Sequence, residues 1–301
     1  MKTSSNDMLR KGADLQACES LTGSLDFDPS SIEPADIRRF RELIMGYYRS
    51  FGRSLPWRTE INPYRVTVSE VMLQQTQVER VRQKYEPFIA RYPGFASLAA
   101  APLSDVLEAW QGLGYNRRAL ALKKIAALVI NTYDGRLPSD PEILRTLPGI
   151  GDATARSICV FAFNLPLAFI ETNIRALFIH FFYRRCTSVH DRDILPLVEK
   201  TLERENPREW YHALMDYGVF LKKQLANPGK KSAHHRRQSP FQGSHRQVRG
   251  LLLRTLLASY PLSREDLAGH LEVPIEAVAR AAGELLEEGF IGEECGLLSI
   301  R

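Results

Sequence analysis

The spacing of apolar residues is the feature that most restricts what this chain can fold into. From Asp36 to about residue 222, apolar side chains recur every three or four residues, which is the period of an amphipathic helix. Nothing alternates in the manner of a strand before residue 285. The pattern therefore predicts an all-α main body. Beyond a first helix from Asp36 and one begun by a Thr76–Glu79 capping box, helices are expected over 65–73, 103–111, 117–132, 141–146, 152–163, 172–183, 191–205 and 207–222.

The two ends of the chain have different patterns from the main body. Residues 1–35 are rich in Ser and Asp and lack periodicity, so we expect a mobile tail. Residues 226–245 are basic and contain Pro, Gly and Ser, and we expect a linker there. The remainder, 246–301, shows helical patterns and then a short hairpin-like ending, which is the order of a winged helix. Those three patterns cover 246–259, 263–271 and 274–288.

Charge is distributed unevenly along the 301 residues. Residues 1–36 carry three Lys or Arg against seven acids, and residues 250–301 carry four Arg against nine acids. Because the whole chain is +5, residues 37–249 carry +14. Within them, residues 222–249 hold eight Lys or Arg and no acid. This favours a polyanion partner, with a solvated basic linker as the alternative. The candidate phosphate contacts here are Lys230, Lys231, Arg236 and Arg237.

Composition excludes several classes of protein. No apolar run approaches 18 residues, so we expect no transmembrane helix, and the first 20 residues lack the apolar stretch of a secretory signal. The cysteines are scattered without a CxxC pair, which argues against a cysteine-ligated metal and favours a reducing compartment. They are Cys18, Cys159, Cys186 and Cys295. We therefore expect a cytoplasmic protein.

The segment Leu147-Pro-Gly-Ile-Gly151 lies between two helical patterns and is the most informative short motif. Gly149 and Gly151 allow a tight turn with no Cβ in the way of a ligand. The amide groups at the start of the following helix can then hold a phosphate. This predicts DNA phosphate binding by Leu147, Gly149 and Gly151, with an ordinary interhelix turn as the alternative.

This hairpin resembles that of the helix–hairpin–helix DNA glycosylases, and other segments resemble the adenine glycosylase (MutY-type) branch. The resemblance covers about residues 37–222 and implies two helical subdomains beside a basic cleft. One would be a six-helix barrel over about 60–164, and the other would combine 36–56 with 165–225. The segments that carry the resemblance are Leu55-Pro-Trp-Arg58, Pro63-Tyr64, Ser69-Glu-Val-Met-Leu-Gln-Gln-Thr-Gln77 and Gly112-Leu-Gly-Tyr115.

The resemblance assigns roles to several of these residues. Excising a base requires flipping it from the stack, filling the gap and improving the base as a leaving group. Glu70, beside an apolar stripe, could have a raised pKa, and the resemblance implies that it protonates the adenine ring. An exposed helical Glu is the alternative. Gln74, Gln75 and Tyr115 lie at turns. Gln75 and Tyr115 would wedge into the duplex, unless they serve as caps or packing groups.

Two further groups of residues belong to the expected site. Trp57 and Arg58 could line the base pocket, although a Trp is more often part of a core. A second carboxylate should stabilise the oxocarbenium-like sugar. The resemblance places it at Glu171, with Asn173 beside it. Family members carry Asp at that position, so the longer Glu is a departure, and the alternative is a structural helix N-cap.

Two residues that the resembled families carry are replaced in this chain, and the replacements restrict the type of reaction expected. Ala153 occupies the place of the lysine with which the endonuclease III branch forms a Schiff base. Lys222 occupies the place of the first cysteine of the family's iron–sulfur loop. We therefore expect a monofunctional glycosylase with no cofactor and no iron–sulfur cluster. The C-terminal 50 residues are too few for the family's 8-oxoguanine-reading domain, and their acidic charge favours packing on the basic body or contact with a protein.

These observations predict an enzyme that excises adenine or a related purine from double-stranded DNA in base excision repair. One alternative is a mismatch glycosylase for thymine, uracil or hypoxanthine. Another is a non-catalytic DNA-binding protein, which would need neither the Glu70 segment nor a second acid. Glu70 favours a purine, because protonating a purine ring is the task for which such an acid is suited.

Overall fold

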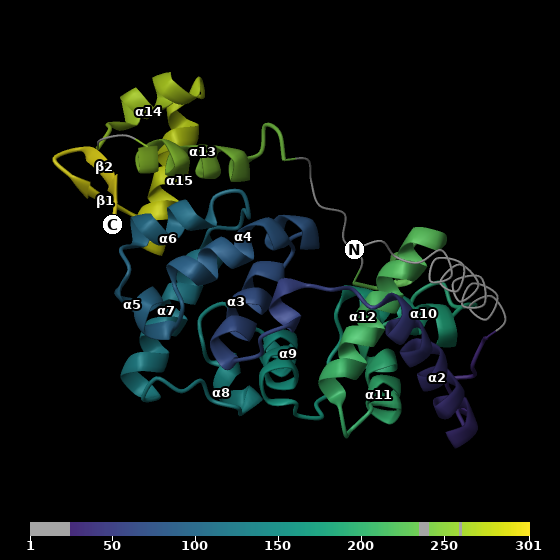
Figure 1. Ribbon diagram of the computed structural model, residues 1–301. Helices are drawn as coiled ribbons and strands as arrows, with labels where there is room; N and C mark the ends of the chain where they lie inside the picture. Colours follow the sequence, from purple (N-terminus) through teal and green to yellow (C-terminus); the bar gives the residue numbers. More distant parts are fainter. Residues whose placement is uncertain (1–24, 235–240, 259–260) are drawn as a thin grey trace, which may run out of the picture. The chain divides into compact units, whose positions relative to one another are not determined.

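The computed structural model describes residues 25–234, 241–258 and 261–301 of the chain. Their contacts divide the chain into two compact units, which we describe separately (Figure 1). Unit 1 comprises the residues up to Thr59 together with Asp152–Arg236, and unit 2 comprises Glu60–Gly151 together with Arg237–Arg301. Both are mainly helical, as predicted. The boundaries of the subdomains that the sequence suggested remain a prediction.

Unit 1 is a bundle in which α10 and α12 lie side by side, with α2, α9 and α11 packed around them (Figure 1). The short helix η2 packs against α10. The elements are α2 (Pro34–Phe51), η1 (Pro56–Arg58), α9 (Asp152–Phe163), α10 (Thr172–Phe182), α11 (Asp191–Thr201), α12 (Pro207–Gln224) and η2 (Pro228–Lys231).

Aromatic side chains form the core of unit 1. Phe40 of α2 is completely buried, and its ring lies 5.3–6.2 Å from five other aromatic rings. All five pairs meet edge to face, which is a favoured arrangement of aromatic rings. The five partners are Phe27, Phe178, Phe181, Phe182 and Trp210.

The expected mobile tail and the expected linker are both folded in part in unit 1. Phe27 stacks on Phe182 and donates its backbone N–H to the Phe181 carbonyl at 2.8 Å. The expected mobile tail of residues 1–35 is therefore wrong for residues 25–35, while residues 1–24 lie outside the described part. The expected linker of 226–245 is also wrong at its start. Ser232 is buried there and forms a β-bridge with Val189.

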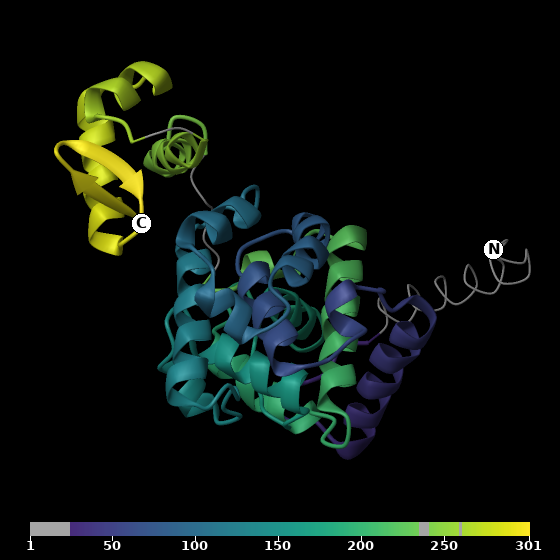
Figure 2. The same cartoon turned by 60° about the vertical axis from the view of Figure 1, so that its left-hand side comes forward.

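Unit 2 contains a helical body and a C-terminal cluster. In the cluster, α13, α14 and α15 pack on one another, and the antiparallel strands β1 and β2 pair Ile291 with Ile300 (yellow in Figure 2). The body consists of α3 (Pro63–Leu73), α4 (Val78–Arg91), α5 (Phe95–Ala100), α6 (Leu103–Trp110), α7 (Arg117–Thr132) and α8 (Pro141–Arg145). The cluster consists of α13 (His245–Ala258), α14 (Arg264–Leu271), α15 (Ile275–Glu288), β1 (Ile291–Glu294) and β2 (Leu297–Ile300).

Helix starts follow from local sequence chemistry. Proline occupies the first position of α3, α8 and α12, where its missing N–H costs no hydrogen bond. The residue before each proline caps the helix with a side-chain oxygen. These caps are Asn62, Asp140 and Asn206.

The predicted helices agree with the structure apart from three differences. Helix α5 was not predicted, because six residues give too short a periodic pattern. The Thr76–Glu79 capping box is wrong, since α4 begins at Val78 after Gln77 and the Thr76 hydroxyl is bound by Arg118 instead. Helix α11 ends at Thr201 and not at 205. Arg41 binds the carbonyls of Thr201 and Leu202 at this helix end. The three C-terminal helices and the hairpin agree with prediction, and the winged-helix assignment remains a prediction.

No helix among the described residues is long and apolar enough to span a bilayer.

Replacing Phe40 with Ala should destabilise the protein by about 3–5 kcal/mol, because it opens a cavity among five aromatic rings. Urea unfolding followed by circular dichroism would measure this. The control is Phe241→Ala, which removes a ring that is 61% exposed and should change the free energy of unfolding by less than about 0.5 kcal/mol. Equal effects of the two substitutions would contradict the proposed core.

Candidate active site

Glu70 is the acidic exception on a helix that is otherwise mostly buried. Its immediate neighbours Ser69 and Val71 are buried, whereas Glu70 is partly exposed. Buried residues lie on most sides of α3. Besides Ser69 and Val71 they are Tyr64, Val66, Thr67, Val68 and Met72. Glu70 is thus a partly exposed acid on a well-packed helix. The general-acid role of Glu70 remains a prediction.

The two turns that carry Gln75 and Tyr115 hold these residues in unusual backbone conformations. Gln75 has φ +52° and Tyr115 has φ +49°, which is the left-handed region that non-glycine residues seldom occupy. Gln75 is exposed, and Tyr115 is 39% exposed. Strained conformations of this kind persist only where the surroundings hold them, and they concentrate at functional sites.

Arg118 holds both turns. Its guanidinium is buried, and the N–H groups of its two terminal nitrogens are shared among six oxygen acceptors. The guanidinium also lies 5.4 Å from the centre of the Tyr115 ring. Burial lowers the pKa of Arg118 to about 10, so the side chain stays charged at neutral pH. The acceptors are the carbonyls of Val71, Met72, Gln74, Leu113 and Gly114 and the hydroxyl of Thr76, at 2.6–3.3 Å.

Arg118 is not among the site residues predicted from the sequence. A signal for it exists, because Arg118 lies four and seven residues before the buried Leu122 and Ile125, on the apolar stripe of α7. A charged residue on such a stripe needs many partners.

The predicted phosphate-binding hairpin follows α8. Gly149 has φ +73°, and a Cβ there would lie 3.0 Å from the Ala121 Cβ, so both conformation and space favour glycine. Gly149 and Gly151 are exposed, whereas Leu147 is buried, which restricts Leu147 to backbone contacts with a ligand. The Gln74 side chain donates to the Gly149 carbonyl at 3.1 Å and so connects the hairpin with the Gln75 turn.

In unit 1, Glu171 is the N-cap of α10. Its Oε1 accepts the backbone N–H groups of Asn173 (2.8 Å) and Ile174 (3.1 Å), and its Oε2 accepts from Asn173 Nδ2 at 3.3 Å. The alternative of a structural cap is therefore realised. It does not exclude chemistry, because a cap fixes the carboxyl group in one position and leaves Oε2 with a single contact among those observed.

Opposing effects act on the Glu171 carboxyl. The residue is partly accessible, yet desolvation by the protein packed around it raises the pKa of Glu171. The Ile174 and Asn173 hydrogen bonds and the charge of Lys222 act in the opposite direction. The positive end of the α10 dipole also favours a carboxylate at this position.

The residues expected at the base pocket have other partners in the structure. Trp57 is buried at 8% exposure, in agreement with the core alternative. The Arg58 Nη atoms bind both carboxylate oxygens of Asp216 at 2.9 Å, and Arg53 binds the same carboxylate. Arg58 therefore ties η1 to α12, and its pocket role remains a prediction.

The basic segment is described only in part. Lys230 is exposed, as a phosphate contact requires. Lys231 donates its Nζ to the Arg184 carbonyl and so has a structural contact. Arg236 and Arg237 lie outside the described residues.

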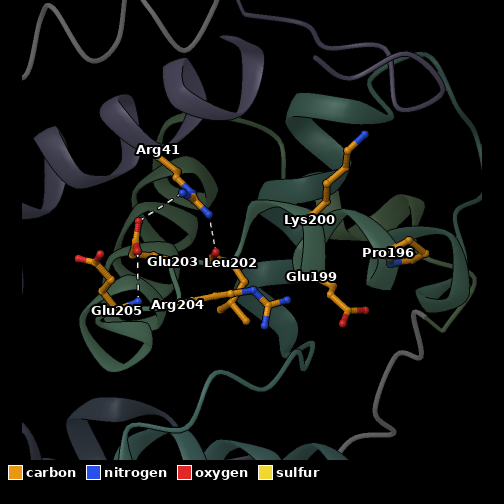
Figure 3. Close-up of a pocket in the computed structure, with 8 residues that line it drawn as sticks. All are labelled: Arg41, Pro196, Glu199, Lys200, Leu202, Glu203, Arg204 and Glu205. Carbon is orange, nitrogen blue, oxygen red and sulfur yellow. Dashed lines mark hydrogen bonds and ion pairs between the residues drawn. The ribbon is translucent and has the colours of Figure 1, made fainter. Parts of the chain in front are cut away.

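A pocket of about 620 Å³ opens in unit 1 away from all of these residues (Figure 3). It is polar and is bounded by Arg41 of α2 and the end of α11. Arg41 pairs with Glu203 at 3.3 Å and binds the carbonyls that end α11, which is a structural role. The pocket contains none of the predicted site residues.

No group of three or more His, Cys, Asp or Glu side chains in the described part of the chain could hold a metal ion. The cysteines described there, Cys159, Cys186 and Cys295, form no disulfide bond with one another.

Comparison with known proteins identifies the family. Residues 68–208 match the model of the HhH-GPD superfamily of base excision DNA repair proteins. Adenine DNA glycosylase of Mycolicibacterium smegmatis is 32% identical over 267 residues, which are 82% of this chain and 91% of that protein. This chain belongs to the adenine DNA glycosylase branch of the HhH-GPD superfamily. The enzyme of that name from Buchnera aphidicola subsp. Baizongia pistaciae is 36% identical over 187 residues. The matched region covers 60% of this chain but only 52% of that relative.

A solved structure supports the fold of this HhH-GPD protein. A thermostable thymine-DNA glycosylase aligns with a TM-score of 0.54 at 25% identity, covering 61% of this chain and 86% of the other. The predicted helix–hairpin–helix glycosylase fold is thus confirmed.

Replacing Arg118 with Met should destabilise the protein by at least about 3 kcal/mol, because buried carbonyls lose their donors. Urea unfolding would measure the loss. The neighbouring Arg117→Met is the matched control. Arg117 is 71% exposed and pairs with Glu288, so its loss should cost about 1 kcal/mol or less. If Arg118→Met unfolded no more readily than Arg117→Met, Arg118 would not hold the turns.

Proposed function

We propose that this protein is a monofunctional DNA glycosylase that excises adenine from duplex DNA in base excision repair. The observation that carries the proposal is Glu70, a partly exposed acid on the mostly buried helix α3 in a chain similar to adenine DNA glycosylases over most of its length. An acid so placed suits protonation of a purine ring, which turns the base into a better leaving group.

The turns of unit 2 suit the extrusion of a base. Gln75 and Tyr115 are exposed side chains on rigid turns, and such groups can fill the gap that a flipped nucleotide leaves. The Gly149–Gly151 hairpin offers exposed backbone for a phosphate, and Lys230 adds charge. Double-stranded DNA is therefore the proposed partner, and we propose that the protein acts as a monomer.

Glu171 would act on the sugar. As the C–N bond breaks, positive charge develops on the deoxyribose, and an ionised carboxylate nearby stabilises it. The cap bonds hold Glu171 in position through Oε1, and Oε2 would face the sugar. Water then completes the hydrolysis, since Ala153 offers no amine for a covalent intermediate.

We also propose that the enzyme works without an iron–sulfur cluster. A four-cysteine loop would need a thiol at position 222, where this chain has Lys222. The residues present do not fit the cluster, and none of the steps above needs it.

Replacing Glu70 with Gln should reduce adenine excision more than tenfold and leave the affinity for duplex DNA within a few-fold of the wild-type value. The substitution removes a proton donor but no contact to a phosphate. Replacing Glu171 with Gln should do the same, since Gln keeps a cap acceptor but not the charge. Single-turnover assays with alkali cleavage at abasic sites would measure excision. Glu86→Gln, an exposed change on α4, is the control and should retain full activity. Excision retained by the Glu70 variant at more than a tenth of the normal rate would overturn its assignment as general acid.

Borohydride should trap little covalent protein–DNA adduct, because no lysine follows the hairpin at position 153. Gel electrophoresis of the enzyme with labelled duplex and borohydride would test this. Efficient trapping would show that another amine attacks the sugar and that the enzyme is bifunctional.

A second candidate substrate class is thymine or uracil in mismatches. The similarity in fold to a thymine-DNA glycosylase favours it. If thymine were the substrate, Glu70→Gln should affect thymine release from a G·T duplex, and adenine release should be absent.

A further inference from the structure

The amide of Asn173 lies between an acid and a cation. Its Nδ2 donates to Glu171 Oε2 at 3.3 Å, and its Oδ1 accepts from Lys222 Nζ of α12 at 2.8 Å. The three side chains form a chain of hydrogen bonds that runs from α12 to the start of α10. Both ends are charged groups removed in part from water, and their opposite charges attract.

Lys222 and Glu171 together fix which way the Asn173 amide points. An ammonium group has three donors and no acceptor, so only the oxygen of the amide can face it. The amide nitrogen must then face Glu171, where it donates to the carboxylate. The Glu171 carboxylate favours the same orientation, because an amide turned over would present its oxygen to a negative charge.

Gly218 brings α12 close enough for this contact. A Cβ at Gly218 would lie 2.5 Å from the Asn173 carbonyl oxygen and 2.9 Å from its Cβ, so only glycine fits. Gly218 and Lys222 are four residues apart and therefore lie on the same face of α12. One residue permits the close approach and the other provides the donor.

We propose that Lys222 is a positioning residue for Glu171, which orients the Asn173 amide toward the carboxylate and favours its ionised form. The inference rests on the proposed function of Glu171 in excision. Lys222 itself would contact neither the base nor the sugar.

The other charges near Glu171 do not replace Lys222. Arg175, one turn further along α10, attracts Glu171, but its guanidinium is paired through two nitrogens with Asp191 of α11 at 2.6 and 2.7 Å. That pairing largely neutralises Arg175. Lys222 has no such carboxylate partner among the observed ion pairs of the described residues.

Lys222→Met tests the proposal by a pH profile. Losing the cation should raise the pKa of Glu171 further. Excision needs the ionised carboxylate. On acidification, the variant should therefore lose activity at a higher pH than the wild-type protein does. We expect the acidic limb of the single-turnover rate for an adenine duplex to move up by about one pH unit, which is roughly a tenfold loss below the limb. Lys222→Arg should keep the wild-type limb, since it retains charge and donors.

Lys223→Met is the matched control, because it removes the same charge from an exposed neighbour on the same helix. It should leave the profile unchanged. A rate loss in Lys222→Met with no movement of the limb would show a merely structural role and overturn the proposal. If Lys222→Met does not fold, Lys222→Gln keeps a donor without the charge, and the same movement is expected.

A second readout does not depend on the substrate. ¹³C NMR of labelled glutamate carboxyls, with Glu171 assigned by its absence in Glu171→Gln, would follow its titration directly. The midpoint should rise in Lys222→Met and not in Lys223→Met, and an unchanged midpoint would overturn the proposal. If the wild-type protein excised no adenine, the proposed function would fail while this titration still decided the role of Lys222.

Discussion

The hydrogen bonds of the buried Arg118 guanidinium are the interactions on which the two turns of unit 2 depend. Two turns carry non-glycine residues, Gln75 and Tyr115, in left-handed conformations that each cost of order 1–3 kcal/mol. The hydrogen bonds of Arg118 supply the surroundings that hold them. Because an arginine carries donors in a fixed plane, one side chain can fix two turns relative to each other.

Unit 1 uses a related arrangement around Glu171. A carboxylate with part of its water removed is held by two backbone amides, an asparagine and the charge of a lysine. In both units a buried or partly buried cation lies on the otherwise apolar face of a helix and organises loops or caps that carry candidate functional groups. Such cations are costly to bury, so their presence indicates a role in positioning.

The helices and the family can be predicted from the sequence. The contacts that organise the candidate site cannot. Periodicity predicts α7 and α9 with their observed bounds, since long amphipathic stripes show both ends. Arg118 and Lys222 were not proposed as positioning residues, because a positive charge in a basic chain suggests solvent or DNA first. The Asp216 pairing of Arg58 links residues 158 positions apart, which no local pattern reveals. The sequence does not predict that residues 25–33 are folded, because their apolar residues do not recur with a regular period.

The central claim is that adenine is the base removed. The most direct test is to incubate the enzyme with duplexes that contain adenine, thymine, uracil or hypoxanthine opposite each normal base, and to identify the released free base by mass spectrometry. The account predicts free adenine, and its loss with Glu70→Gln. Release of thymine or uracil with no adenine, or no base from any duplex, would contradict it.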